Sequence, residues 1–372
     1  MIPYGRHNLN QSDIDAVASV LESDWLTTGP EVEKFEEKLS KIVGSRCISV
    51  SSGTAALHCA YAAIDIEPGD EIITPPITFV ATQATAAMFG AKIVFADVDP
   101  QTATIMPSAV EAAVTSKTKA IVAVDYAGHP SELNELRKIA DRRGLFLIED
   151  AAHSLGSIYR GKPVGSIADL TTFSFFPTKN MTTGEGGAVA SAVHQLLEKS
   201  RLFGRQGMVR DSVGFKIQTE GPWHQEVHEF GLNYRLPDIL CALGTSQLSR
   251  LSSFKAARRK IFKQYCSFFE DNTNVTLPTE REYVDSNWHL FPIRVAKEKR
   301  QEIFQNMRNA GIGVQVNYLP AYRHPVFNGY KINPLEFPNS EEYYEREISL
   351  PIHPNLNESD IDFICQTLSS LL

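Results

Sequence analysis

Short apolar runs alternate with amphipathic segments along the first 150 residues of the chain. The apolar runs have the length of buried strands and fall at residues 47–52, 71–75, 91–98, 120–125 and 145–150. Between them, apolar residues recur at helical spacing in residues 53–64, 78–90, 107–114 and 131–144. This alternation predicts an α/β fold whose mainly parallel sheet is covered by helices on both faces. In such sheets, ligands bind beyond the carboxyl ends of the strands.

The N-terminal part adds two helices. Ser12 is a good N-cap for a helix that reaches residue 23, and Gly29-Pro30 precedes a second helix over residues 31–44. After a further helix at residues 191–203, residues 204–229 are polar and aperiodic. So long an irregular segment is more often functional or ordered by a partner than idle.

The pattern changes again in the last third of the chain. Helices are expected at residues 236–251, 254–269, 298–310, 340–347 and 358–371, with separated strands at 289–295 and 313–319. We therefore predict a large domain over residues 1–250 and a smaller α+β domain over residues 251–372. The first helix is expected to pack on the smaller domain.

Composition narrows the class of partner. The 372 residues are 43% hydrophobic and 22% charged, which is ordinary for a globular protein, and the formal net charge of -8 argues against a nucleic-acid surface. The five cysteines form no CxxC pair, so neither a zinc ribbon nor a disulfide framework is indicated. No window approaches the roughly 18 apolar residues of a membrane span. The sequence predicts a cytoplasmic protein that acts on small molecules.

One stretch carries the most distinctive chemistry. Residues 171–187, TTFSFFPTKNMTTGEGG, read as a strand that breaks at Pro177, presents Lys179 and ends in glycines. A lysine just past the end of a strand can be held over a carbonyl and form a Schiff base. Taken alone, such a lysine is more often an ordinary surface residue.

Other strand ends supply groups that suit an aldehyde cofactor bearing a phosphate. Gly53-Thr54 starts a helix after a strand, where free N–H groups and a hydroxyl can bind phosphate, although an ordinary N-cap has the same form. Asp150 ends an apolar strand and can keep a pyridine nitrogen protonated. The remaining candidates, each with an alternative structural role, are His153 beside the ring, Ser174 for the phosphate and Phe79 for stacking.

Several segments together resemble one protein family. SSGTAAL (51–57), TFVAT (78–82), EDAAHSLGS (149–157), FSFFPTKNMTTGEGG (173–187) and GLNYRLPDILCALGTSQL (231–248) occur in the order and spacing of the nucleotide-sugar aminotransferases of the DegT/DnrJ/EryC1/StrS family. The resemblance covers nearly the whole chain. It implies a fold-type I, pyridoxal 5'-phosphate-dependent enzyme of aspartate aminotransferase architecture, with a seven-stranded sheet.

The resemblance also implies residue roles. Lys179 is the Schiff-base lysine, which then shuttles a proton, and Asp150 pairs with the pyridinium nitrogen. Phe79 stacks on the ring, with His153 beside the cofactor. The phosphate is bound by Gly53, Thr54, Ser174 and, from the other subunit of a homodimer, Asn233. The segments around Thr28 and Gly29, and those holding Tyr318, Tyr322 and His324, match family segments that line the sugar-nucleotide cleft.

The tail TTGEGG and the segments at 124–130, 286–295 and 347–357 resemble members of the pseudaminic-acid pathway. The resemblance implies transfer of an amino group from glutamate to C4 of a UDP-linked 4-keto-6-deoxy-N-acetylhexosamine. Phe176 departs from that subgroup, which often has His there. Another nucleotide keto-sugar, of the C3, perosamine or bacillosamine type, and a regulatory protein without catalysis are the alternatives.

Other signals are weaker. HQEVH at residues 224–228 has the histidine spacing of a helical zinc site, but Gln replaces the catalytic Glu and the flanks are not helical, so we expect no metal. Arg258, Arg259 and Lys260 could meet a diphosphate, although such charge runs usually form a solvated face. No GxGxxG follows the first strand, which argues against a nicotinamide dehydrogenase.

Overall fold

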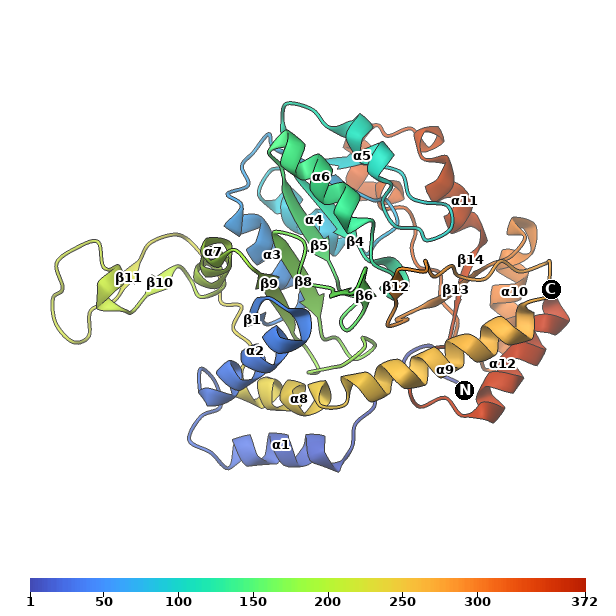
Figure 1. Cartoon of the computed structure of the whole chain (residues 1–372), viewed down its shortest axis with the longest axis horizontal. Helices are drawn as coiled ribbons and strands as arrows, with labels where there is room; N and C mark the ends of the chain where they lie inside the picture. The colour runs from blue at the N-terminus through green and yellow to red at the C-terminus, as the bar shows by residue number, and fades with distance from the viewer.

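The computed structural model describes residues 1–372, and a seven-stranded sheet lies at its centre (Figure 1). Its strands are, in spatial order, β1 (Arg46–Val50), β9 (Gly187–Ser191), β8 (Leu170–Ser174), β5 (Phe146–Asp150), β4 (Thr118–Val124), β2 (Glu71–Thr74) and β3 (Lys92–Phe95). The strands from β8 to β3 pair in parallel, whereas β9 is antiparallel to both its neighbours. The predicted mainly parallel sheet is confirmed. Strand β9 was not predicted, because Val189 is the one β-branched residue among its small side chains GAVAS, and it has no aromatic residue.

Helices cover both faces of this sheet, as the alternating pattern predicts. Alternate strand residues such as Ile48, Val122 and Ile148 face one core, and Ile121 and Leu147 face the other. The first core contains residues of α3 (Gly53–Ala63), α4 (Ala81–Met88) and α7 (His194–Gly204). Helices α5 (Pro107–Ala113) and α6 (Leu133–Arg143) pack on the other face, and α2 (Pro30–Val43) and α8 (Asp238–Leu248) pack beside Phe173 and Ala188.

A separate apolar core forms from the last third of the chain. Its strands are β13 (Phe291–Arg294) and β14 (Glu347–Leu350), and its helices are α9 (Leu251–Phe269), α10 (Lys297–Asn309) and α12 (Glu358–Leu371). Helix α11 (Pro338–Arg346) leads into β14. The short strands β6 (Ile158–Tyr159), β7 (Lys162–Pro163) and β12 (Val284–Asp285) form a small additional three-stranded sheet. Figure 1 shows α9 running from beside α8 to α12. The division between residues 250 and 251 stays our proposal.

Three local expectations are corrected. The first helix, α1 (Gln11–Leu21), begins after Asn10, not Ser12, because the Asn10 side chain and Asp13 form a capping box. The helix packs on α8, where Asp13 accepts from Ser246 Oγ at 2.6 Å, and does not join the smaller core. Residues 313–319 are not a strand: β13 pairs with β14 instead, and only isolated bridges occur nearby.

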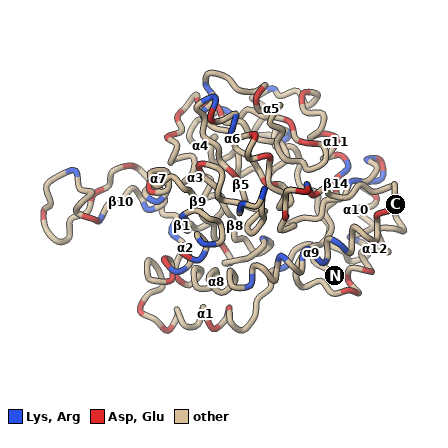
Figure 2. Tube along the Cα trace, in the orientation of Figure 1, with Lys and Arg blue, Asp and Glu red and all other residues tan.

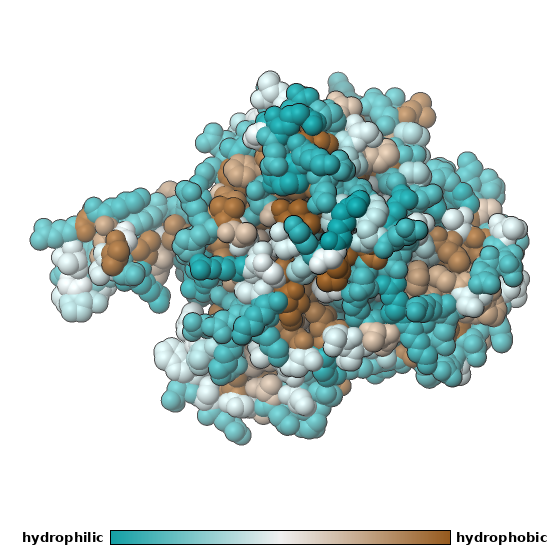
Figure 3. All heavy atoms as spheres, in the orientation of Figure 1, coloured by the Kyte–Doolittle hydropathy of each residue, from teal (hydrophilic) through white to brown (hydrophobic).

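Residues 205–232 project from the body as an arm (Figure 1). The arm carries β10 (Met208–Val209) and β11 (Glu226–Val227) and is otherwise irregular, as its aperiodic sequence indicates. Glu226 holds it together: its carboxylate accepts from Lys216 N at 2.8 Å and Ile217 N at 3.0 Å. Apolar side chains stand out on the arm's surface (Figure 3), and Phe230 is 99% exposed.

No helix of the protein combines the length and apolar character needed to cross a membrane.

Candidate functional site

A cavity of ≈ 510 Å³ opens where β5 and β8 end and α3 begins. Eight residues that the sequence singled out line it together: Gly53, Thr54, Phe79, Asp150, His153, Ser174, Lys179 and Tyr318. They come from segments up to 265 residues apart in the chain. Strands β5 and β8 pair in parallel, with Asp150 beside Thr172, so their carboxyl ends meet at the same edge of the sheet. The cavity is therefore built at the carboxyl edge of the sheet, as expected for this class of fold.

The start of α3 forms a cup of unused donors. The Ser52 hydroxyl caps the helix by accepting from Ala55 N at 3.0 Å. The N–H groups of Gly53 and Thr54 and the hydroxyls of Thr54 and Ser174 form no hydrogen bond within the chain. A Cβ on Gly53 would lie only 2.8 Å from Ser174 Cβ, so glycine is what allows the two sides of the cup to meet. Unused donors at a helix N-terminus fit a phosphate.

Lys179 is held inside the cavity by the loop between β8 and β9. Phe175 N donates to Gly186 O at 2.9 Å and Thr183 N donates to Phe175 O at 3.1 Å, which closes the loop. Burial lowers the pKa of Lys179 to about 8, an effect that the nearby Asp150 carboxylate partly opposes. About a tenth of this amine is thus uncharged and nucleophilic at pH 7, far more than for an ordinary lysine.

Asp150 is a buried carboxylate with two fixed donors. Thr82 Oγ1 donates to its Oδ2 at 2.7 Å, and Ala152 N donates to its Oδ1 at 3.2 Å. Burial raises the pKa of Asp150, while these two donors and the Lys179 ammonium lower it. The group is therefore positioned to hold a protonated ring nitrogen by charge and hydrogen bonding.

A group of aromatic rings stands beside these residues. His153 lies with its ring centroid 4.3 Å from that of His289, and its Nε2 is 3.2 Å from Tyr318 Oη. Burial and the Lys179 charge hold the pKa of His153 well below its usual range, so the imidazole is neutral. Its buried Nδ1 has no hydrogen-bond partner within the chain.

Two phenylalanines bring apolar surface to this cavity. Phe79 is 60% exposed and Phe176 is 46% exposed, although both line the cavity. The ring of Phe79 lies 6.3 Å from that of Tyr318. A flat ring entering the cavity would find an uncovered face of Phe79 for stacking.

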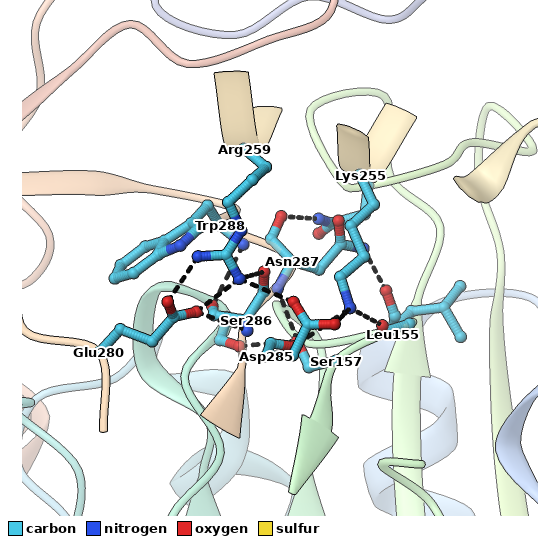
Figure 4. A network of polar contacts seen from close by, with 12 residues as sticks. Leu155, Ser157, Lys255, Arg259, Glu280, Asp285, Ser286, Asn287 and Trp288 are labelled. Atoms are coloured by element: carbon cyan, nitrogen blue, oxygen red, sulfur yellow. Dashed lines mark hydrogen bonds and ion pairs between the residues drawn. The ribbon is translucent and has the colours of Figure 1, made fainter. Parts of the chain in front are cut away.

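A network from the second core supports the loops of the cavity (Figure 4). Asn287 N donates to Ser157 Oγ at 2.9 Å, and the Asn287 side chain donates to Leu155 O. Lys255 and Arg259 hold the same segment through Asp285, at 2.8 and 2.7 Å. Asn180 Nδ2 in turn donates to Asn287 O at 2.9 Å, so the residue next to Lys179 is tied to the second core.

Other residues singled out from the sequence lie elsewhere. Thr28 and Gly29 line a different cavity, and Asn233 is exposed and absent from the Lys179 cavity of its own chain. Tyr322 is buried against Phe95 and donates to Glu341 at 2.6 Å, and His324, nearby in the chain, does not line the Lys179 cavity either.

The weaker sequence signals also find structural partners. His224 and His228 both contact the Glu226 carboxylate, at 3.3 and 2.5 Å. Arg258 is buried, not solvated, and donates to the carbonyls of Trp288, His289 and Ile352. Lys260 pairs with Glu358 at 2.9 Å.

Sequence reasoning missed several groups of the site. Thr82 was inside a quoted motif, but nothing marked its hydroxyl as a partner of Asp150. His289, 136 residues from His153 in the chain, is brought to it only by the packing of the second core on the sheet. Glu185 and Thr178 also line the cavity. A single sequence carries no signal for such contacts.

The comparisons with known proteins agree with this geometry. The model of the DegT/DnrJ/EryC1/StrS aminotransferase family matches residues 7–369. The chain is 38% identical to the UDP-4-amino-4,6-dideoxy-N-acetyl-beta-L-altrosamine transaminase of Campylobacter jejuni over 100% of this chain and 98% of that protein.

Solved structures extend the likeness. PseC of Helicobacter pylori, described as an aminotransferase involved in the biosynthesis of pseudoaminic acid, superimposes with a TM-score of 0.93 at 33% identity, covering 100% of this chain and 98% of that one. The putative sugar aminotransferase Spr1654 of Streptococcus pneumoniae, solved in a PMP-form, gives a TM-score of 0.94 at 29% identity, covering 100% and 99%. The same protein is also known in a PLP-form.

A phosphate cup, a buried amine and a buried carboxylate fit pyridoxal phosphate, and the family match spans almost the whole chain. The chain belongs to the DegT/DnrJ/EryC1/StrS family and is a pyridoxal phosphate-dependent sugar aminotransferase.

Proposed function

We propose that this enzyme transfers an amino group from glutamate to C4 of a UDP-linked 4-keto-6-deoxy-N-acetylhexosamine, as in pseudaminic-acid-type biosynthesis. The observation that carries the proposal is the 38% identity, over 100% of this chain and 98% of the other, to a protein named as the transaminase of UDP-4-amino-4,6-dideoxy-N-acetyl-beta-L-altrosamine. The TTGEGG tail after Lys179 supports amination at C4. A cytoplasmic location remains part of the proposal, since UDP-sugars are made there.

Lys179 is proposed as the residue that binds the cofactor aldehyde and then moves the proton. Bound pyridoxal phosphate supplies an electron sink that stabilises negative charge on the substrate carbon. With a pKa of about 8, the Lys179 amine can attack a carbonyl as a free base and can also return a proton near neutral pH. The loop that carries Lys179 is closed by backbone hydrogen bonds, so the amine is expected to stay in the cavity when it is no longer bonded to the cofactor.

The neighbouring side chains are proposed to orient the ring. Asp150, fixed by Thr82, would hold the ring nitrogen in its protonated form. His153, neutral and with a free Nδ1, would contact the ring's polar edge, and Phe79 would stack on its face. Gly53, Thr54 and Ser174 would hold the phosphate.

We also propose a homodimer in which Asn233 of one subunit reaches the phosphate of the other. Asn233 is exposed at the base of the arm, and the arm exposes Val213, Trp223 and Phe230 without covering them itself. Several large exposed apolar side chains on one projecting segment support a subunit contact there.

The decisive experiment separates the two half-reactions. The yellow holoenzyme is first mixed with glutamate, and loss of its visible absorption band reports amino transfer to the cofactor. The aminated enzyme is then offered a panel of UDP- and dTDP-linked 4-keto and 3-keto sugars. Return of the band with the UDP-linked 4-keto-6-deoxy-N-acetylhexosamine alone supports the proposal. If the band returns only with a 3-keto or dTDP-linked sugar, the proposed sugar substrate is wrong. If glutamate does not remove the band, glutamate is not the amino donor.

A further inference from the structure

A tyrosine from the C-terminal third of the chain reaches the Lys179 cavity and contacts His153. Tyr318 lines this cavity, and its Oη lies 3.2 Å from His153 Nε2, with the two ring centroids 6.2 Å apart. Within the chain, the Tyr318 hydroxyl has no other hydrogen-bond partner. Burial raises the pKa of Tyr318, so the hydroxyl keeps its hydrogen and can donate it to the neutral imidazole.

The residue before Tyr318 is held from two sides at its backbone. Asn317 N donates to Glu347 Oε2 at 2.7 Å, and Tyr126 Oη donates to Asn317 O at 2.5 Å. The Asn317 side chain is held as well, since its Nδ2 donates to Ser349 Oγ at 3.0 Å. Ser349 Oγ in turn lies 2.5 Å from Glu347 Oε1, so both carboxyl oxygens of Glu347 take part. Because Tyr318 is the next residue in the chain, its placement depends on these contacts.

Glu347 is a carboxyl group without a basic partner. It is the first residue of β14 and is fully buried. Figure 2 shows basic residues in the region of this strand, but none of them forms an ion pair with Glu347. Arg294, opposite Glu347 on β13, donates to Pro100 O, and Arg300 donates to a backbone carbonyl at 2.5 Å. Burial raises the pKa of Glu347 to about 8, so most of this group is neutral at pH 7 and needs no counter-charge.

A neutral imidazole carries one ring hydrogen, and the partner of one nitrogen decides which nitrogen holds it. We propose that Glu347 is a positioning residue for His153. Through Asn317, Glu347 keeps the Tyr318 hydroxyl where it donates to the imidazole Nε2, so the ring hydrogen stays on Nδ1. This Nδ1 is buried and has no partner within the chain, so as an N–H group it can donate to an acceptor of the bound cofactor.

A displaced Tyr318 would leave both tautomers open to His153. The tautomer with its hydrogen on Nε2 would present Nδ1 to the cofactor as an acceptor instead of a donor. Glu347 therefore acts on the reaction at a distance, by selecting one tautomer of a residue in the cavity. The inference rests on the proposed place of His153 beside the cofactor ring, and not on the proposed sugar or amino donor.

The tautomer can be read directly in the holoenzyme. The protein is labelled with ¹⁵N in its histidine rings, and long-range ¹H–¹⁵N correlation spectra show which nitrogen of each ring carries the hydrogen. His153→Gln assigns the His153 signals by their loss. We expect the hydrogen on Nδ1 in wild type, and loss of this preference in Tyr318→Phe.

Two substitutions test Glu347 itself. Glu347→Gln keeps an acceptor for Asn317 N and a neutral side chain of the same shape, so it should keep the wild-type tautomer. Glu347→Ala removes the acceptor and should give the same His153 signals as Tyr318→Phe. Circular dichroism and the visible band of the holoenzyme show whether each variant is folded. If Glu347→Ala does not fold, Ser349→Ala takes its place, because it loosens both Glu347 and Asn317.

Tyr265→Phe is the matched control. It also deletes a buried tyrosine hydroxyl, which donates to Pro351 O at 2.9 Å and does not line the Lys179 cavity. The His153 tautomer should be the same in this variant as in wild type.

Rates give a second readout. Tyr318→Phe and Glu347→Ala should each slow the loss of the visible band on mixing with glutamate about tenfold. The double variant should be no slower than either single one, because both changes act through one hydrogen bond. Glu347→Gln should stay within about twofold of wild type.

The proposal is overturned if His153 carries its hydrogen on Nε2 in wild type. It is also overturned if Glu347→Ala keeps the wild-type tautomer, if Glu347→Gln behaves as Glu347→Ala does, or if the two rate effects add in the double variant. If glutamate removes no band from wild type, the proposed donor is wrong, whereas the spectra, which need no substrate, still decide the role of Glu347.

Discussion

Thr82 donates its hydroxyl hydrogen to Asp150 Oδ2 at 2.7 Å, and both residues are buried. Thr82 belongs to the first turns of α4, and Asp150 ends β5. The hydrogen bond favours the charged form of Asp150 against the burial that disfavours it. The negative charge that Asp150 offers to a bound ring nitrogen therefore depends on the Thr82 hydroxyl, although Thr82 is not proposed to contact the ring.

Thr82→Val, which keeps the shape of the side chain, should raise the pKa of Asp150. Because the ionised form is the active one, the acid limb of the kcat/KM profile should move to higher pH, and kcat/KM at pH 7 should fall about tenfold. The measurement is the pH profile with a saturating amino donor. Thr85→Val is the control: it lies on the same helix and bonds only to Ala81 O. Equal profiles for the two variants would contradict the role of Thr82.

The Lys179 amine should react as a group with a pKa of about 8. In the apoenzyme its rate of reductive methylation, followed by peptide mass spectrometry, should rise with pH and reach half its maximum near pH 8, because only the free base reacts. Lys179→Ala should abolish the absorption band of the cofactor bound covalently to this lysine. A rate that keeps rising above pH 9.5 would contradict the effect of burial.

Gly53→Ala should weaken cofactor binding. The added Cβ would meet Ser174 at 2.8 Å, and the overpacking would push the two sides of the phosphate cup apart. We expect the Kd for pyridoxal phosphate to rise about tenfold or more, measured by fluorescence titration of apoenzyme. Gly329→Ala, at a glycine with nothing within 4 Å, should bind as wild type.

The shared active site can be tested by complementation. Lys179→Ala and Asn233→Ala subunits should each be nearly inactive, but mixed dimers contain one site with both native residues. After unfolding and refolding of an equal mixture, about a quarter of the wild-type activity should return. Lys179→Ala mixed with Asp150→Ala is the control, because both changes lie in the cavity of one chain and no native site can form. No recovery in the first mixture would place Asn233 outside the site.

The sequence predicts the part of the site that follows from local pattern. Asp150, Ser174 and Lys179 stand at or just past strand ends, and the parallel register of β5 and β8 is enough to bring them together. The mainly parallel sheet could be predicted for the same reason, since apolar runs alternate with helices. The helix over residues 358–371 could be predicted because its N-cap and apolar spacing are both regular.

What could not be predicted depends on packing between distant segments. His289 reaches His153 through the packing of the second core on the sheet, where Asn287 is also hydrogen-bonded to the loop after β5. Strand β9 lies between β1 and β8 although its small side chains show no strand pattern, because its neighbours supply the pairing. Thr28 and Gly29 lie in a separate cavity because Asp238 of α8 accepts from Gly29 N at 2.8 Å and holds the start of α2 there.

Helix α9 has a mechanical consequence for turnover. Leu251 at its start is buried with α2 and α8, while Ile261, Tyr265 and Phe269 are buried in the second core. Bending the helix would uncover one of these side chains, at a cost on the order of 2 kcal/mol for each. The two cores are thus joined by one continuous helix, which opposes a hinge motion between them at this point. Rearrangement at the cavity is then expected to fall to its exposed lining side chains, such as Phe79 and Phe176.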